Sequence, residues 1–254
     1  MSKKRTVEKK GMSKRQARLE ELRKKERQQR IIIIVAIVVI AAVIIALIAI
    51  PSTQKPTDIT GGFVKVTPVS YKTADGTSLG NPDAKVVIDV FEDFQCSVCQ
   101  VYTKEVEPQV IAEIAEPGKV FYSFHQYSFE PDSDPNLKES DNAAMASECA
   151  AEQNRFWDYK NILFANQTHL EGQFSETRLE DFAKSLSLNM NEFKACYQQR
   201  RYQNKLDEGY NLGVKMGVTG TPTIFINGVD VSPGKMPSFE LILKAVEQAL
   251  AASQ

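Results

Sequence analysis

The sequence predicts an α/β domain that carries an inserted block of helices and follows a single N-terminal transmembrane helix. Three patterns indicate this architecture. Residues 31–50 contain no charged or polar side chain, which is typical of a membrane span. Residues 86–91 and 224–226 are mostly β-branched and aromatic, as buried strands are. Between these strands, residues 139–213 have a helical pattern throughout.

The first thirty residues form a dense basic tail, with 13 Lys and Arg against 4 Asp and Glu. As a helix, the apolar run 31–50 would be roughly 30 Å long, about the thickness of a bilayer core. This run is longer than the apolar part of a secretory signal peptide, and residues 49–52 make a poor cleavage site. We therefore expect a retained signal anchor in the cell membrane, with tail 1–30 in the cytoplasm and the C-terminal domain outside.

The basic tail has two interpretations. A run of this charge density can bind nucleic acid, but positive charge beside a membrane span more often sets the orientation of the span. We favour the second interpretation, which also brings the tail into contact with the lipid bilayer. The rest of the chain has 18 basic against 28 acidic residues, and this argues against nucleic-acid binding there. Residues 51–62 are polar, contain two prolines and are expected to be a linker.

Residues 63–138 are expected to form the first part of the folded domain. A short strand is predicted at residues 63–66, followed by turn signals and by the buried strand at 86–91. A helix should come next, with a kink or a restart at Pro108. Residues 119–127 are predicted to be a further strand.

Residues 139–213 are expected to be the helical insertion, and residues 214–254 the second part of the α/β domain. The insertion begins with an alanine-rich stretch and continues through several amphipathic segments. The second part contains the strand at 224–226, an Asn-Gly hairpin turn, a short return strand and an amphipathic C-terminal helix.

A Cys-x-x-Cys motif, Cys96 and Cys99, directly follows the strand at 86–91 and opens the next helix. The unpaired N–H groups at a helix N-terminus favour a thiolate, so the pKa of Cys96 should be lowered. Cys99 lies one turn further on and can close a disulfide with Cys96. A zinc half-site is the alternative, but the other two cysteines are too far apart in sequence to supply the second half. The motif therefore favours redox chemistry, with no metal and no cofactor.

A second motif, Thr221-Pro222 before the strand at 224–226, supports redox chemistry. A proline at the start of a central strand indicates special geometry, usually a cis peptide bond. With these two motifs the chain resembles the thioredoxin superfamily, in which a cis-proline loop faces the two cysteines. The string Leu-Gly-Asn-Pro-Asp-Ala-Lys at 79–85 resembles, more narrowly, that of DsbA-like thiol–disulfide oxidoreductases. The resemblance covers about residues 63–254 and implies a thioredoxin fold with an inserted helical domain.

The resemblance implies an extracytoplasmic enzyme that forms disulfides in cysteine-containing secreted or membrane proteins through mixed disulfides. Cys96 would exchange with the substrate, Cys99 would resolve the intermediate, and Thr221 and Pro222 would contact the substrate. An oxidising enzyme also needs a quinone-linked membrane partner for its own reoxidation, similar to DsbB or to vitamin K epoxide reductase. Two alternatives stay open: a reductase or isomerase on the same fold, and a non-catalytic binding module.

The two residues between the cysteines depart from the family pattern. Ser97 and Val98 stand where strong oxidants of the DsbA type carry Pro-His. Because neither side chain adds a charge, we expect a pKa of Cys96 between the ~3.5 of DsbA and the ~8.5 of a free cysteine.

Glu92 and Asp93 are candidates for the proton shuttle that related folds keep beneath the resolving cysteine. Neighbouring strand residues point to opposite faces, so the sequence leaves open which of the two faces the site, and a solvated acid pair is the alternative. Cys149 and Cys196 are either two free buried cysteines or a bridged pair. The extracytoplasmic setting favours a structural disulfide, which some DsbA-like proteins carry in their helical domain.

Overall fold

The computed structural model describes residues 62–130, 134 and 136–253, together with Lys25 and Gln28. Within these residues the strands form a five-stranded sheet in the order β1-β3-β2-β4-β5. The strands are β1 (Ser78–Gly80), β2 (Val87–Glu92), β3 (Phe121–Gln126), β4 (Thr223–Ile226) and β5 (Val229–Asp230). β2 and β3 run parallel, and the other neighbours are antiparallel. β2 is therefore the central strand, and its carboxyl end leads directly to Cys96.

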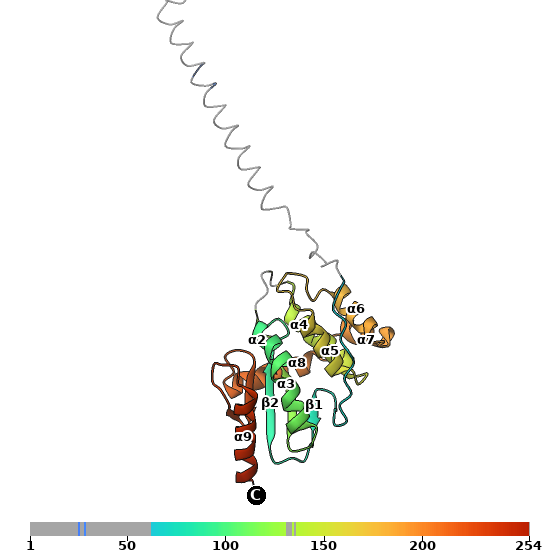
Figure 1. Cartoon of the computed structure of the whole chain (residues 1–254). Helices are drawn as coiled ribbons and strands as arrows, with labels where there is room; N and C mark the ends of the chain where they lie inside the picture. Colours follow the sequence, from blue (N-terminus) through green and yellow to red (C-terminus); the bar gives the residue numbers. More distant parts are fainter. Residues whose placement is uncertain (1–24, 26–27, 29–61, 131–133, 135, 254) are drawn as a thin grey trace, which may run out of the picture. The chain divides into compact units, whose positions relative to one another are not determined.

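Helices cover both faces of the sheet (Figure 1). One face carries α2 (Ser97–Glu105), α3 (Glu107–Val110), the π-helical turn η1 (Ile111–Ala115) and α9 (Phe239–Ala252), and the other carries α8 (Gln203–Met216). Ile88 and Val90 of β2 belong to the main core, whereas Phe91 packs with Tyr127 beneath α8. Gly213 allows α8 to approach this closely, because a Cβ atom there would lie 2.6 Å from the Tyr127 ring.

The first helix segment breaks at the expected place. α2 ends at Glu105, and α3 restarts at Glu107 with Pro108 in its first turn. Proline has no backbone N–H to donate, which the first turn of a helix tolerates and the helix interior does not. The restart predicted at Pro108 is confirmed.

Helices fill the region expected to be the insertion. They are α4 (Glu139–Ala151), α5 (Phe156–Ala165), α6 (Glu176–Ser185), α7 (Met190–Gln198) and the start of α8. A disulfide joins Cys149 of α4 to Cys196 of α7, so of the two alternatives for this pair the structure has the bridge. α5 packs against both α4 and α2, and the helices share one core with the sheet. The domain borders drawn between residues 138 and 139 and between 213 and 214 stay a prediction.

The strand predicted at residues 63–66 is wrong. The Val64 N–H donates to Asn166 Oδ1 (2.7 Å), and the Val64 carbonyl accepts from Asn166 Nδ2 (2.8 Å). Phe63 packs edge-on against Phe182 of α6, with ring centroids 5.1 Å apart. The asparagine side chain thus satisfies backbone groups that a neighbouring strand would otherwise bind. The apolar side chain of Phe63 packs against a helix and not within a sheet.

The described residues contain no helix with the length and apolar composition needed to cross a membrane. The predicted tail 1–30 (apart from Lys25 and Gln28), the predicted span 31–50 and the linker up to residue 61 lie outside the described residues.

Replacing both Cys149 and Cys196 with Ala should lower the free energy of unfolding by roughly 2–4 kcal/mol, because the bridge closes a loop of 47 residues in the unfolded chain. Denaturant unfolding of both proteins, with Cys96 and Cys99 reduced in each, measures the difference. Alkylation at Cys96 should keep its rate. An unchanged midpoint, or two further titratable thiols in the parent protein, would contradict a structural bridge.

Candidate active site

Cys96 is the N-cap residue of α2 and follows the end of β2 at Glu92 after a short turn. Its side chain is only 4% exposed, and its thiol is not bridged to Cys99. The hydrogen bond from the Cys99 thiol has the largest influence on the pKa of Cys96, and Thr221 and the first backbone N–H groups of α2 lower it as well. Together they outweigh burial and lower the pKa of Cys96 to about 6.

The pKa of Cys99 is shifted in the opposite direction. Cys99 lies one turn into α2 and is fully buried. Burial raises its pKa well above the usual value, and the Cys96 sulfur and the Glu92 carboxylate raise it further. At neutral pH the motif therefore holds one thiolate, Cys96, and one thiol, Cys99. This division is what a nucleophile and a resolving group require.

The Thr221-Pro222 loop lies against Cys96. The Thr221-Pro222 peptide bond is cis, and the Cys96 thiol donates to the Thr221 carbonyl at 3.1 Å. A hydrogen bond from Thr223 Oγ1 to the Gly220 carbonyl (2.7 Å) ties the loop to the start of β4. The structure thus brings together residues that are 125 positions apart, and it leaves backbone groups of the loop beside the reacting sulfur.

Asp93 is buried and holds the cysteine loop in place by hydrogen bonds. One carboxylate oxygen accepts from the Gln95 N–H (2.8 Å) and the Ser140 hydroxyl (2.6 Å), and the other accepts from the N–H groups of Phe129 (2.6 Å) and Glu130 (2.8 Å). Burial raises the pKa of Asp93, against these four hydrogen bonds. Because both oxygens are occupied by structural donors, Asp93 is poorly placed to exchange protons with Cys99.

Glu92 is the acid whose charge acts on Cys99. It is fully buried, and its carboxylate raises the pKa of that thiol. Burial raises the pKa of Glu92 to about 8, while the ammonium of Lys160 lowers it and the charge of Glu107 raises it. A carboxyl group with a pKa near neutrality can both accept and donate a proton under working conditions.

Sequence reasoning missed Lys160, Glu107 and Thr103, which surround Glu92. Lys160 Nζ of α5 is fully buried and lies 2.5 Å from Glu107 Oε2. The same nitrogen is 3.3 Å from Glu92 Oε1, an ion-pair distance without hydrogen-bond geometry. It also donates to Thr103 Oγ1 at 2.8 Å. The available signal was a single lysine within the otherwise largely apolar and aromatic face of α5.

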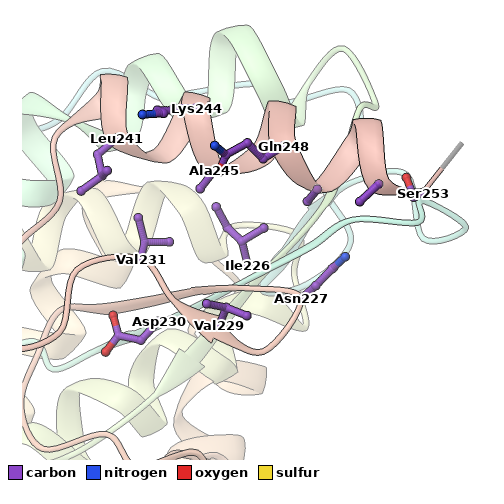
Figure 2. A pocket seen from close by; sticks show the side chains of 12 residues that line it. Ile226, Asn227, Val229, Asp230, Val231, Leu241, Lys244, Ala245, Gln248 and Ser253 are labelled. Carbon is purple, nitrogen blue, oxygen red and sulfur yellow. The ribbon is translucent and has the colours of Figure 1, made fainter.

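Two further features lie away from the cysteines. His125, one of the two histidines of the sequence, pairs with Asp89 (2.8 Å) and stacks on Phe91, beneath α8. A hollow of about 560 Å³ between the β4–β5 hairpin and α9 has none of the candidate residues in its wall. Figure 2 shows Ile226 and Val231 facing α9 across this hollow.

A family model identifies the family to which this chain belongs. Residues 72–247 match the family model described as thioredoxin. The chain is 29% identical over 153 residues to the disulfide bond formation protein D of Bacillus subtilis, a match that spans 59% of this chain and 66% of that protein.

Solved structures show the same architecture. Oxidised BdbD from Bacillus subtilis superposes with a TM-score of 0.60 at 25% identity, covering 75% of this chain and 100% of that one. DsbA of Chlamydia trachomatis superposes with a TM-score of 0.59 at 20% identity, covering 76% of this chain and 99% of that one. The described domain therefore has a thioredoxin-like α/β fold.

Alkylation of the reduced protein should be half-maximal near pH 6, because the reactive form of Cys96 is the thiolate and its pKa is lowered to about 6. Iodoacetamide labelling followed by mass spectrometry measures the rate at Cys96 across the pH range. In Cys99→Ala the midpoint should rise, since the largest stabilising hydrogen bond is lost. A midpoint near the ~8.5 of a free cysteine in the parent would contradict the assignment.

Proposed function

Because the chain belongs to the thioredoxin family and is a DsbA-like thiol–disulfide oxidoreductase, we propose that it forms disulfide bonds in cysteine-containing proteins outside the cytoplasm. The observation that carries this proposal is the split between the two cysteines: Cys96 has a pKa of about 6 and Cys99 has a strongly raised one. A low pKa makes Cys96 a good leaving group, and this favours release of an oxidised substrate.

The reaction has two exchange steps. A substrate thiolate attacks Cys96 Sγ of the Cys96–Cys99 disulfide, forms a mixed disulfide and expels the Cys99 thiolate. A second substrate thiolate then attacks the substrate sulfur of the mixed disulfide and expels the Cys96 thiolate. The substrate loses two electrons and gains a disulfide, and the cysteine pair gains the same two electrons.

Glu92 supplies the proton that this reaction moves. Cys99 leaves as a thiolate in a site where burial disfavours its charge, so it takes a proton from protonated Glu92. In the reverse direction Glu92 takes the proton from Cys99 before that thiol attacks. Asp93, the other candidate, holds the cysteine loop in place instead.

Substrate contacts centre on the Thr221-Pro222 loop. The Thr221 carbonyl lies beside Cys96, where an extended substrate could pair its backbone with the loop, as in thioredoxin-like folds. Val98 is 42% exposed next to Cys96 and offers an apolar surface. Backbone pairing and a small apolar contact suit many substrate sequences, which an enzyme acting on diverse secreted or membrane proteins requires.

The reduced enzyme must pass its two electrons on. We propose that a quinone-linked membrane protein, similar to DsbB or to vitamin K epoxide reductase, reoxidises the cysteine pair. The basic tail 1–30 and the apolar run 31–50 support a single-pass anchor with the enzyme domain outside the cytoplasm. Such an anchor would keep the cysteine pair near that partner.

Cys99→Ala should accumulate disulfide-linked substrates on Cys96, because no second thiol remains to release a trapped adduct. Non-reducing electrophoresis of cells expressing the variant shows the adducts, and the double variant Cys96→Ala/Cys99→Ala is the matched control that should show none. Adducts formed in Cys96→Ala through Cys99 would invert the assigned roles. A complete lack of adducts in Cys99→Ala would favour a non-catalytic binding module.

Membrane orientation can be tested with fusions to alkaline phosphatase, which is active only outside the cytoplasm. Fused after Gln254 it should be active, and fused before Met1 it should be inactive, because the basic tail stays on the cytoplasmic side. Deletion of residues 1–50 should abolish the activity of the C-terminal fusion. The reverse pattern of activity would contradict the proposed location of the enzyme.

A further inference from the structure

A groove of about 460 Å³ lies between α2 and α5, on the flank of the buried charge cluster. Its wall is formed by Gln100, Thr103 and Lys104 of α2 and by Asn161, Phe164 and Ala165 of α5. The groove is wide enough to hold water in contact with Thr103, whose side chain is partly exposed.

Thr103 is also part of the cluster that holds Glu92. Its hydroxyl donates to Glu92 Oε2 at 3.3 Å and accepts from Lys160 Nζ at 2.8 Å. Glu92, Lys160 and Glu107 are at most 2% exposed, so none of these three charged groups reaches solvent directly. Among the described residues bonded to Glu92, Thr103 is the one that also borders the groove.

We propose that the Thr103 hydroxyl relays the proton between Glu92 and water in the α2–α5 groove. This inference rests on the proposed role of Glu92 as the proton shuttle of Cys99. Thr103 does not touch the reacting sulfurs, and acts only through Glu92.

The relay conserves protons at each step. Before Cys99 attacks a mixed disulfide, its S–H bond breaks and the proton moves to the Glu92 carboxylate. The Thr103 hydroxyl then rotates its hydrogen from Glu92 Oε2 to a groove water. Glu92 donates its proton to Thr103 Oγ1 while the original hydroxyl hydrogen passes to that water, and the newly bound hydrogen again lies toward Glu92 Oε2. When Cys99 leaves as a thiolate, the same transfers run in reverse.

The other titratable groups around Glu92 are poor carriers. Burial disfavours the charge of Lys160, but the carboxylates of Glu107 and Glu92 more than compensate and raise its pKa, so it stays protonated. Glu107 is held by Lys160 and by the Tyr122 hydroxyl at 2.8 Å. Burial raises the pKa of Tyr102 and of Tyr122 well above the usual value, so both stay neutral.

The test follows the two half-reactions of the reduced protein with oxidised glutathione. Cys96 first attacks and forms a glutathione mixed disulfide, and Cys99 then resolves it to the Cys96–Cys99 disulfide and free glutathione. Acid quenching and mass spectrometry give both rates as a function of pH. Thr103→Val removes the hydroxyl with little change of shape, and Thr103→Ser keeps it. Thr177→Val, on the exposed surface of α6, is the control for a threonine-to-valine change.

In Thr103→Val the plateau of the resolving rate should fall roughly tenfold or more, with a larger solvent isotope effect and an unchanged first step. Thr103→Ser and Thr177→Val should behave as the parent. A purely structural role would shift the pH midpoint and leave the plateau unchanged, and this result would overturn the relay. An equal loss of plateau rate in Thr103→Ser would also overturn it.

A double variant gives a second, independent criterion. Glu92→Gln should slow the resolving step, and adding Thr103→Val should slow it no further, because the two groups act in series. Additive losses would show that Thr103 acts without Glu92 and would overturn the relay. If the parent itself fails to resolve the mixed disulfide, the proposed function fails, whereas a parent that resolves it at the rate of Thr103→Val refutes the relay alone.

Discussion

The burial of the Lys160 ammonium between two carboxylates is the interaction on which the site depends. A buried charge is tolerated only when it is paired and hydrogen-bonded, and removing one partner typically costs about 3–5 kcal/mol. Lys160 belongs to α5 of the insertion, Glu92 ends the central strand, and Glu107 begins α3. Pairing these three residues therefore fixes the inserted helices against the sheet directly beneath the cysteines. The same arrangement keeps Glu92 in a poorly solvated place, where its proton affinity is raised.

The pKa values of Cys96 and Cys99 differ because of the surroundings of the two thiols and not because of the side chains between them. Ser97 and Val98 supply no charge, yet the pKa of Cys96 is lowered to about 6, inside the interval expected from the sequence. The stabilising groups are the Cys99 thiol and the start of α2, which follow from placing Cys96 at a helix N-cap, and Thr221, which the loop before β4 supplies. His125, which could have replaced the missing histidine of the Pro-His pair, stacks on Phe91 instead. The Cys99 thiol, together with the helix start and Thr221, thus lowers the pKa of Cys96 without a charged side chain between the two cysteines.

Local patterns in the sequence predicted the central strands, the break at Pro108, the cysteine motif and the Thr221-Pro222 loop, because each depends on short-range periodicity or on the geometry of proline. Residues 63–66 misled for a physical reason: they have the apolar, partly β-branched composition of a strand, but an asparagine 102 positions away takes the place of a neighbouring strand. The sequence could not decide between Glu92 and Asp93 as the candidate proton shuttle. Both are buried at the end of β2, so the choice depends on their partners in the folded structure. The partner of Glu92, Lys160, is 68 positions along the chain, and no local pattern links residues so distant.

A disulfide exchange enzyme faces a conflict between covering its cysteines and supplying them with protons. A substrate bound at the Thr221-Pro222 loop would lie over Cys96 and would shield Cys99, which is already fully buried, from solvent on that side. Thr103 lies seven residues beyond Cys96, about 10 Å along the axis of α2. A proton route through Glu92 toward the α2–α5 groove would open away from the N-terminus of α2, the proposed place of substrate binding. Proton transfer could then continue while the mixed disulfide is in place, which is the moment when Cys99 changes its charge.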